Sequence, residues 1–421
     1  MVNIFKKILS HEIARNSALL SAGTFASQFL AIVTTPMISR LYGPEIIGES
    51  NVVVLIAQIL LPISAMSIPF LIVTSRDYAE ARDAYFASVL ASAIVAVLVM
   101  FIIATNGLVS NLNSEIVGLC LLPFFVIFYG LAQANQYFLT REGNFGYIAI
   151  SAFCGIAFTQ LMKIFGGFFE LGGFYLVFSS LAGAFISFSV FCFFVFKCKK
   201  IKSSDLKKQL KCASIFFRKN IKYISYKVPQ GFVNATSQTA PPLMFGLFYG
   251  STQLAFYSMA NMFVSAPSLI ISKPIAEVLF PLISNRLKSD EQVGPILTRT
   301  VIMLAVIGIF PLFLFIFYSD LLVVWFFGDK WSGVSVYAFY LSLWLYVSFI
   351  SRPFVYVFTI LRKEKEYFYH EIISCIFRLL VIYLGFLLWD SDKLSIALLS
   401  FVGVFFNIVI ICRAFFLISN R

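Results

Sequence analysis

Long apolar runs separated by short polar intervals make up almost the whole chain. Each run is close to the ~20 apolar residues that a helix needs to cross a bilayer, and the runs lack the alternating pattern of β-barrel strands. We therefore predict an all-α integral membrane protein with about twelve transmembrane helices. The runs lie roughly at 16–38, 50–73, 84–105, 115–138, 147–166, 173–196, 223–249, 253–280, 296–318, 334–360, 368–389 and 394–417.

One polar interval, residues 197–222, is longer and more basic than the others. It carries many Lys and Arg residues and a single acidic residue, Asp205. Because six apolar runs precede it and six follow, we expect an N-lobe at 1–196, a basic cytoplasmic linker at 197–222 and a C-lobe at 223–421. Part of this linker, around 215–217, is apolar enough to lie on the membrane surface as an amphipathic segment.

The two halves of the chain also share landmarks that lie six helices apart. The turn Leu41-Tyr42-Gly43 has its counterpart in Phe248-Tyr249-Gly250, and the helices that follow contain Pro62 and Pro267. Two parallel repeats of this kind are an architecture of membrane transporters.

Composition and charge support this picture. The chain is 60% hydrophobic with 12% charged residues, far from a soluble domain. The net charge of +12 could suggest nucleic acid, but the basic residues lie between apolar runs, where they orient helices. With the N-terminus in the cytoplasm, every cytoplasmic interval carries Lys or Arg and three of the six outer intervals carry none. Both termini are therefore predicted to be cytoplasmic.

Several chemistries are not indicated by the sequence. Its seven cysteines include no C-x-x-C pair and no Cys/His cluster, so we expect neither metal nor disulfides. A phosphate-binding G-x-x-x-x-G-K-S/T motif is also missing, so this chain is not expected to hydrolyse ATP.

The first outer turn reads Arg40-Leu-Tyr-Gly-Pro-Glu-Ile-Ile-Gly48, and a later outer interval reads Gly328-Asp-Lys-Trp331. With the basic turns after the runs at 115–138 and 334–360 and the basic interval between the halves, these stretches resemble Wzx-type polysaccharide (O-antigen) flippases of the MOP superfamily. That superfamily also includes the MATE drug exporters and the lipid II flippases.

The resemblance implies two six-helix bundles around a central cavity, working by alternating access in a bacterial cell inner membrane. It implies an undecaprenyl-diphosphate-linked oligosaccharide as substrate, moved from the cytoplasmic to the periplasmic leaflet for lipopolysaccharide biosynthesis. A polysaccharide polymerase and a chain-length regulator are the protein partners expected with it. No cofactor is implied, and the expected energy source is proton or sodium coupling.

Charged residues inside the predicted spans are the first candidates for function, because each costs ~2.5–3.5 kcal/mol on insertion. We expect Arg378, Arg352 and Lys273 to attract the diphosphate. Each has a structural alternative: Arg378 could pair inside the bundle, Arg352 could reach the cytoplasmic interface, and Lys273 could be neutralised by Glu277. Lys163 is a further substrate-binding candidate that could instead reach the outer interface.

Other candidates are polar or lie at gates. Gln133 and Gln136 are predicted to bind sugar hydroxyls, although amides in spans also join helices. Arg40 could serve as a gate or as a structural clamp, while Glu277 and Glu371 are candidates for ion coupling.

Two other function classes remain open. A MATE-like multidrug or cation exporter would favour buried carboxylates, whereas the buried charges here are mostly cationic. A membrane O-antigen polymerase or glycosyltransferase would place its chemistry in a large extramembrane loop, whereas the longest interval here is basic and poor in carboxylates. We therefore expect a transporter rather than an enzyme.

Overall fold

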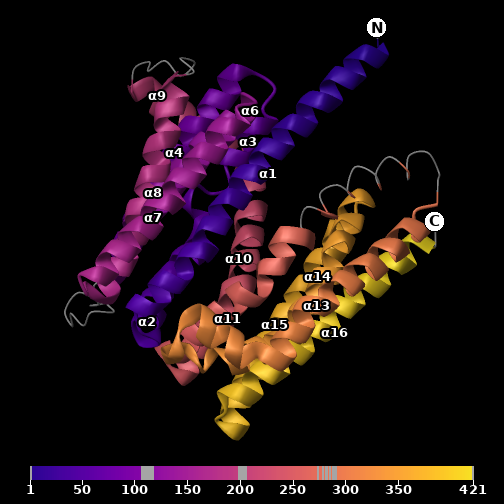
Figure 1. Cartoon of the computed structure of the whole chain (residues 1–421). Coiled ribbons are helices and arrows are strands. Elements are labelled where there is room, and N and C mark those ends of the chain that lie inside the picture. The colour runs from indigo at the N-terminus through magenta and orange to yellow at the C-terminus, as the bar shows by residue number, and fades with distance from the viewer. Residues whose placement is uncertain are drawn as a thin grey trace. The chain divides into compact units, whose positions relative to one another are not determined.

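The computed structural model describes residues 2–105, 118–197, 206–272 and 292–419, with isolated positions between 275 and 286. All regular secondary structure in these residues is helical, and each predicted apolar run is mainly helical over its described part. Nine of the described helices are long and apolar enough to cross a membrane (Figure 1). The all-helical membrane fold is confirmed, whereas the count of twelve spans and the side of the termini stay predictions.

The chain forms two compact units. Unit 1 comprises residues 1–42 and 49–239, and unit 2 comprises residues 43–48 and 240–421. The division falls inside one helix, α10 (Ile221–Tyr249). This division does not test the predicted N-lobe at 1–196, linker at 197–222 and C-lobe at 223–421, which stay predictions.

Unit 1 is built on a helix pair packed along its length. α7 (Phe145–Phe168) and α8 (Gly172–Lys197) contact each other, α1 (Val2–Leu41) packs on α7, and α6 (Leu122–Arg141) packs on α8 and on α4 (Tyr78–Thr105). The core between α4, α6 and α8 is made of small and aromatic residues, among them Ala87, Ala134 and Phe138. Small side chains let helices approach closely in a membrane, where packing rather than water exclusion holds them together.

The apolar run at 50–73 is broken rather than a single helix. α2 (Pro44–Ser64) ends two residues after Pro62, and α3 (Pro69–Thr74) begins after a short link. In this link Met66 and Ser67 have φ values of 51° and 53°, a left-handed conformation uncommon for residues other than glycine. Hydropathy does not record backbone dihedrals, so the apolar pattern could not reveal this break.

Side chains replace the backbone hydrogen bonds that the break removes. The Ser64 hydroxyl donates to the Leu61 carbonyl (2.7 Å). Arg141, at the end of α6, donates to the carbonyls of Ile72 (2.8 Å) and Ser75 (2.7 Å) at the end of α3. A positive charge at a helix C-terminus is favourable because the carbonyls there carry partial negative charge.

Residues Leu206–Lys219 of the basic interval form a helix, α9, that packs against α4. Ala213 and Phe216 are buried in the core of unit 1, while Ile215 stays exposed. Lys219 donates to Glu80 on α4 (3.1 Å). The suggestion that residues 215–217 rest on the membrane is therefore wrong for Phe216, because its side chain is used in packing on α4.

Unit 2 contains α11 (Ser251–Pro267), α13 (Gly294–Phe327), α14 (Val334–Ile360), α15 (Glu364–Trp389) and α16 (Asp392–Ser419). α14 is the central helix and packs against α11, α13 and α16. After Pro267, α11 passes into a π-helical turn, Ser268–Ser272, whose last hydroxyl donates to the Phe349 carbonyl of α14. The proline-containing helix is thus irregular in both halves of the chain.

The repeated tyrosine turns have the same role in both units. The Tyr42 hydroxyl donates to the Lys163 carbonyl near the end of α7 (2.9 Å). The Tyr249 hydroxyl donates to the Ser391 carbonyl in the α15–α16 turn (3.3 Å) and lies 2.7 Å from the Ser395 hydroxyl. Each tyrosine therefore fastens its turn to a helical hairpin of its own unit, which agrees with the repeat predicted from the sequence.

The turn at 40–48 and the interval at 328–331 also contain residues with packing roles. A Cβ on Gly48 would lie 3.0 Å from Ser251 Cα, too near for most real contacts, so glycine permits the close approach there. Trp331 is fully buried, with its ring 6.3 Å from that of Phe256 on α11.

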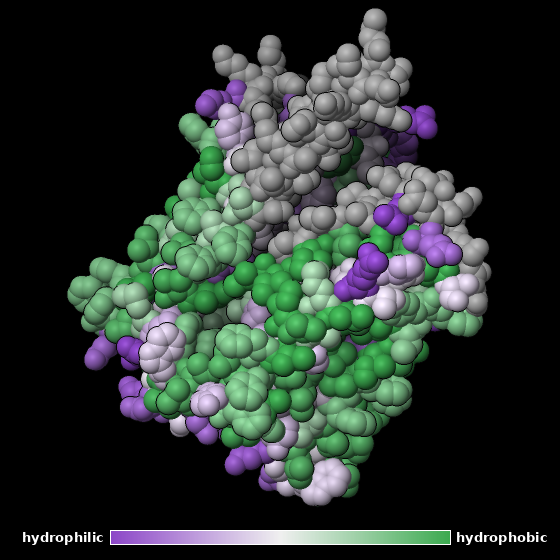
Figure 2. All heavy atoms as spheres, turned by 45° about the vertical axis from the view of Figure 1, so that its right-hand side comes forward, coloured by the Kyte–Doolittle hydropathy of each residue, from purple (hydrophilic) through white to green (hydrophobic). Residues whose placement is uncertain are grey.

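The surface is as apolar as a lipid-facing protein requires. Figure 2 shows a face dominated by apolar residues, with hydrophilic residues gathered in patches at its margins. Exposed large side chains include Met100 and Phe101 on α4 and Phe310, Phe317 and Trp325 on α13. Soluble monomers rarely expose so much contiguous apolar surface, so this surface is typical of a protein that faces lipid.

Candidate functional site

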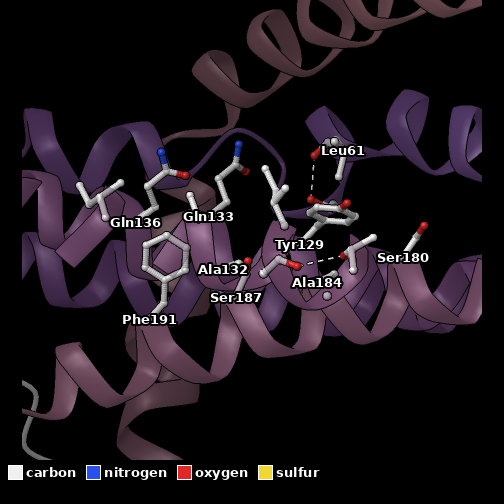
Figure 3. Close-up of a pocket in the computed structure, with 16 residues that line it drawn as sticks. Leu61, Tyr129, Ala132, Gln133, Gln136, Ser180, Ala184, Ser187 and Phe191 are labelled. Atoms are coloured by element: carbon white, nitrogen blue, oxygen red, sulfur yellow. Dashed lines mark hydrogen bonds between the residues drawn. The ribbon is translucent and has the colours of Figure 1, made fainter. Parts of the chain in front are cut away.

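A cavity of about 400 Å³ opens inside unit 1. Four helices form its wall: α2, α6, α7 and α8. Figure 3 shows Gln133 and Gln136 side by side on α6, pointing the same way, with the ring of Phe191 beside Gln136. The lining residues are Leu61, Ser64, Tyr129, Ala132, Gln133, Gln136, Ile148, Ala152, Gly155, Ile156, Thr159, Ser180, Gly183, Ala184, Ser187 and Phe191.

One wall of the cavity exists because α7 and α8 cross at two glycines. A Cβ on Gly155 would lie 2.8 Å from the Gly183 carbonyl oxygen, and a Cβ on Gly183 would lie 2.7 Å from that of Gly155. Thr159 and Ser187 follow these glycines by four residues on each helix. Such small-xxx-small spacing lets helices touch in membranes, and here it brings hydroxyl groups into the cavity wall.

The polar groups of the cavity are uncharged. Each of four lining hydroxyls gives its proton to a backbone carbonyl: Ser64 to Leu61, Thr159 to Gly155, Ser180 to Leu176 and Ser187 to Ser151, at 2.7–3.2 Å. The buried Gln133 Oε1 has no hydrogen-bond partner among the described residues. The wall therefore offers mainly hydrogen-bond acceptors to whatever enters it.

Unit 2 contains a charged cluster instead of a neutral cavity. Arg352 on α14 and Arg378 and Glu371 on α15 are each half-buried. All three interact electrostatically with the hydroxyl of Tyr367, which also donates to Glu371 Oε1 (3.3 Å). The tertiary structure therefore brings together three of the residues predicted from the sequence.

The two arginines keep unused hydrogen-bonding capacity. Nε of both Arg352 and Arg378 is buried and has no partner within the described part of the chain. The Arg378 guanidinium lies 5.1 Å from the ring centroid of Trp344 on α14, a cation–π contact. This contact is a form of the structural pairing considered for Arg378, but it leaves the Nε–H donor without a partner among the described residues, so this group can still bind an anion.

The remaining predicted site residues are found neither in the cavity of unit 1 nor in the charged cluster of unit 2, or lie outside the described residues. The Lys163 side chain is half-buried on α7, and Lys163 is not among the residues that line the cavity. Arg40 is exposed at the end of α1. Lys273 and Glu277 lie outside the described residues, so their predicted roles and their predicted pairing are not tested.

Several amides in the spans join helices, as the alternative interpretation expected. Asn135 on α6 accepts from the Tyr85 hydroxyl of α4 (2.7 Å) and donates to Cys192 of α8 (3.2 Å). Asn407 on α16 accepts from Ser351 of α14 (2.6 Å). For these two residues a structural role is confirmed, whereas Gln133 and Gln136 line a cavity.

Tyr129, Thr159 and Ser187 in unit 1 and Trp344 and Tyr367 in unit 2 are site residues that sequence reasoning missed. The spacings Gly155-x-x-x-Thr159 and Gly183-x-x-x-Ser187 were a usable signal for the cavity wall. No comparable local pattern marks Trp344 or Tyr367, because their significance lies in neighbours on other turns and helices.

An Asp390-Ser391-Asp392 sequence, the D-x-D pattern of many glycosyltransferases, occurs in the turn between α15 and α16. Asp392 accepts from the Tyr337 hydroxyl (2.7 Å) and from the Lys393 amide (2.8 Å) at the start of α16. Asp392 is the first residue of α16, where a carboxylate is favourable at the helix N-terminus, and the capping residue is Ser391, whose hydroxyl accepts from the Leu394 amide (3.4 Å). No group of three or more potential metal ligands occurs among the residues that the structure describes.

The sequence profile of a family described as polysaccharide biosynthesis proteins matches residues 37–336, about seven-tenths of the chain. The chain belongs to this polysaccharide biosynthesis protein family. The matched region includes the cavity of unit 1 and ends before Arg352, so the charged cluster of unit 2 lies beyond it. None of the curated proteins matches the sequence.

Solved structures show which fold this polysaccharide biosynthesis protein has. It is similar to the lipid II flippase MurJ in an inward closed conformation, with a TM-score of 0.70, 15% identity and coverage of 96% of this chain and 90% of that one. It is also similar to an inward-facing MATE-family multidrug resistance transporter of the MOP superfamily, with a TM-score of 0.69, 11% identity and coverage of 93% and 95%.

A third similar structure is a MOP-superfamily transporter from Pyrococcus furiosus, with a TM-score of 0.60, 13% identity and coverage of 97% and 95%. At these identities the likenesses show a common fold and nothing finer. This polysaccharide biosynthesis protein therefore has the fold of MOP-superfamily transporters over nearly its whole length.

Proposed function

We propose that the protein is a flippase for undecaprenyl-diphosphate-linked oligosaccharides, carrying O-antigen-type repeat units from the cytoplasmic to the periplasmic leaflet of a bacterial inner membrane. Membership of a polysaccharide biosynthesis family supports a glycan-related role. The fold shared with a lipid II flippase supports movement of a lipid-linked substrate. The cycle is alternating access, and its energy comes from ion coupling in which Glu371 is the described candidate.

The observation that carries this proposal is the pair of arginines inside unit 2. A lipid-linked oligosaccharide has a diphosphate, which must leave water to cross the bilayer and is costly to move without a cationic partner. Arg352 and Arg378 are half-buried, and each has an Nε–H donor that finds no partner among the described residues. Arginine suits this task because its planar donors match phosphate oxygens.

A drug-exporting function is the second candidate, since multidrug resistance transporters share the fold. A site for cationic drugs is expected to contain carboxylates without counter-charges. In the cluster of unit 2, by contrast, Glu371 is accompanied by two arginines. The charge balance favours an anionic substrate.

Deleting the gene tests the proposal. We expect lipid-linked repeat units to accumulate in the cytoplasmic leaflet and surface polysaccharide to disappear, with both defects reversed by the wild-type protein. If single repeat units still reach the periplasm and only their polymerisation fails, the protein acts as a polymerase and the proposal is wrong. Unchanged surface polysaccharide together with new drug sensitivity would favour the exporter.

A further inference from the structure

We infer that the cavity of unit 1 is a saccharide-binding subsite that holds the glycan of the lipid-linked substrate. This inference rests on the proposed function and adds a site and a ligand class to it. Three properties of the cavity support it: the hydrogen-bonding character of its wall, the lack of charge in that wall, and the size and aromatic surface of the cavity.

The wall is matched to a ligand that donates hydrogen bonds. A hydroxyl has one proton and two lone pairs, and four lining hydroxyls have already given their protons to backbone carbonyls. Gln133 Oε1 adds a buried acceptor that has no partner in the described part of the chain. An unsatisfied buried acceptor is costly, and a ligand hydroxyl would remove that cost.

The same wall disfavours an anion. None of the lining residues is charged, and lone pairs directed at a phosphate or a carboxylate would repel it. Neutral hydroxyl groups, which are donors and acceptors at once, fit both the lining oxygens and the Gln133 amide N–H groups. A sugar ring is the part of the proposed substrate that has this chemistry.

The size and surface of the cavity also suit a sugar. Its volume of about 400 Å³ lies within the ~300–1,000 Å³ of small-molecule sites. Tyr129 and Phe191 contribute aromatic side chains to a lining that otherwise consists of small, aliphatic and uncharged polar residues. Sugar rings have apolar C–H faces that pack on aromatic rings while their hydroxyls bond at the edge, so a mixed wall of this kind can hold both surfaces.

Binding of two lipids to the purified full-length protein tests the inference. The probes are undecaprenyl diphosphate and the lipid-linked oligosaccharide extracted from cells that lack the protein. Gln133→Leu removes the unpaired acceptor, and Ala184→Leu reduces the cavity volume. We expect each variant to bind the oligosaccharide lipid about tenfold more weakly, because Gln133→Leu loses a ligand hydrogen bond and Ala184→Leu takes space from the ligand. Both variants should bind undecaprenyl diphosphate as wild type does.

Gln160→Leu on α7 is the matched control, since it removes an amide from the same unit but not from the cavity lining. It should leave both affinities unchanged. Unchanged undecaprenyl diphosphate binding by the cavity variants also shows that they are folded. Equal losses for both lipids, or no loss for either, would overturn the saccharide subsite.

Two further measurements separate this inference from the proposed function. Arg378→Ala should weaken the binding of both lipids. If the wild-type protein binds neither lipid, the proposed function itself fails. If wild type binds both lipids equally well, the flippase proposal stands and the saccharide subsite does not. Tetraphenylphosphonium serves as a third probe, and its binding with dependence on Gln133 would make the cavity a cation site and contradict the inference.

Discussion

The cavity of unit 1 is neutral and the polar cluster of unit 2 is charged, although the two units share the same repeated turns and proline-containing helices. Unit 1 encloses a neutral cavity walled by hydroxyls and the Gln133 amide. Unit 2 holds Arg352, Arg378 and Glu371 around Tyr367. Yet each unit has a tyrosine turn fastened to a helical hairpin and a proline-containing helix with an irregular end. The difference teaches that a repeated scaffold can carry two chemistries, because only the few polar side chains inside it need to change.

The largest expected effect on transport comes from removing one positive charge from the cluster of unit 2. Arg378→Gln should reduce transport about 10- to 100-fold, since hydrogen bonds to charged groups contribute ~1.5–3 kcal/mol. The delivery of repeat units to the periplasm, at equal amounts of membrane protein, measures this. Arg378→Lys should restore transport in part because it keeps the charge but not the planar donors.

Wild-type transport by Arg378→Gln would show that the charge difference between the units has no role in function. Arg352→Gln is the matched variant, because Arg352 is also half-buried but lacks the contact with Trp344.

The next largest effect is expected from substituting the glycines at which two helices of one unit meet. Gly183→Val should destabilise the protein by ~1–3 kcal/mol, since extra methyl groups must fit against the α7 backbone. Gly385→Val in unit 2 should cost a similar amount because a Cβ there would lie 3.0 Å from Ser395 Cα. Thermal unfolding of the purified variants is the measurement.

The two glycine variants should differ in binding. Gly183 lines the cavity, so Gly183→Val should also weaken binding of the oligosaccharide lipid relative to binding of undecaprenyl diphosphate. Gly385→Val should lower stability without changing that ratio. Identical binding profiles would remove the distinction between a cavity wall and an ordinary helix contact.

Removing the shared tyrosine contacts should have a smaller effect. Tyr42→Phe and Tyr249→Phe each delete one hydroxyl that bonds a helical hairpin, which contributes ~0.5–1.5 kcal/mol. Because each contact lies within its own unit, the losses of unfolding free energy should add in the double variant. A non-additive double variant would mean that the two turns are energetically coupled.

The smallest effect concerns the surface ion pairs. Lys219→Ala breaks the bond between α9 and Glu80 of α4, and Arg413→Ala breaks that between α16 and Glu366. Each of these side chains is at least 32% exposed, so each loss should be at most ~1 kcal/mol and should shrink as salt is added. Unfolding in low and high salt measures this.

Particular residues show how far the sequence could predict the site. Arg352, Arg378 and Glu371 were recognisable because a charge in an apolar run is costly wherever it points. Gln133 and Gln136 were recognisable as amides three residues apart on one helix, and the structure places both at one cavity. Lys163 satisfied the same rule as the arginines but is not among the residues that line the cavity, and its described contact is the Tyr42 hydroxyl bond to its backbone carbonyl.

The sequence by itself determined the all-helical membrane fold, because a bilayer leaves few ways to satisfy backbone groups and hydropathy records which segments enter it. It also indicated the repeated tyrosine turns. Only the tertiary structure decided that the run at 50–73 is broken at Met66 and Ser67, that Phe216 packs on α4, and that the glycines of α7 and α8 meet to form a cavity wall. These features depend on backbone dihedrals and on contacts between helices distant in the chain, and no local pattern of hydrophobicity contains that information.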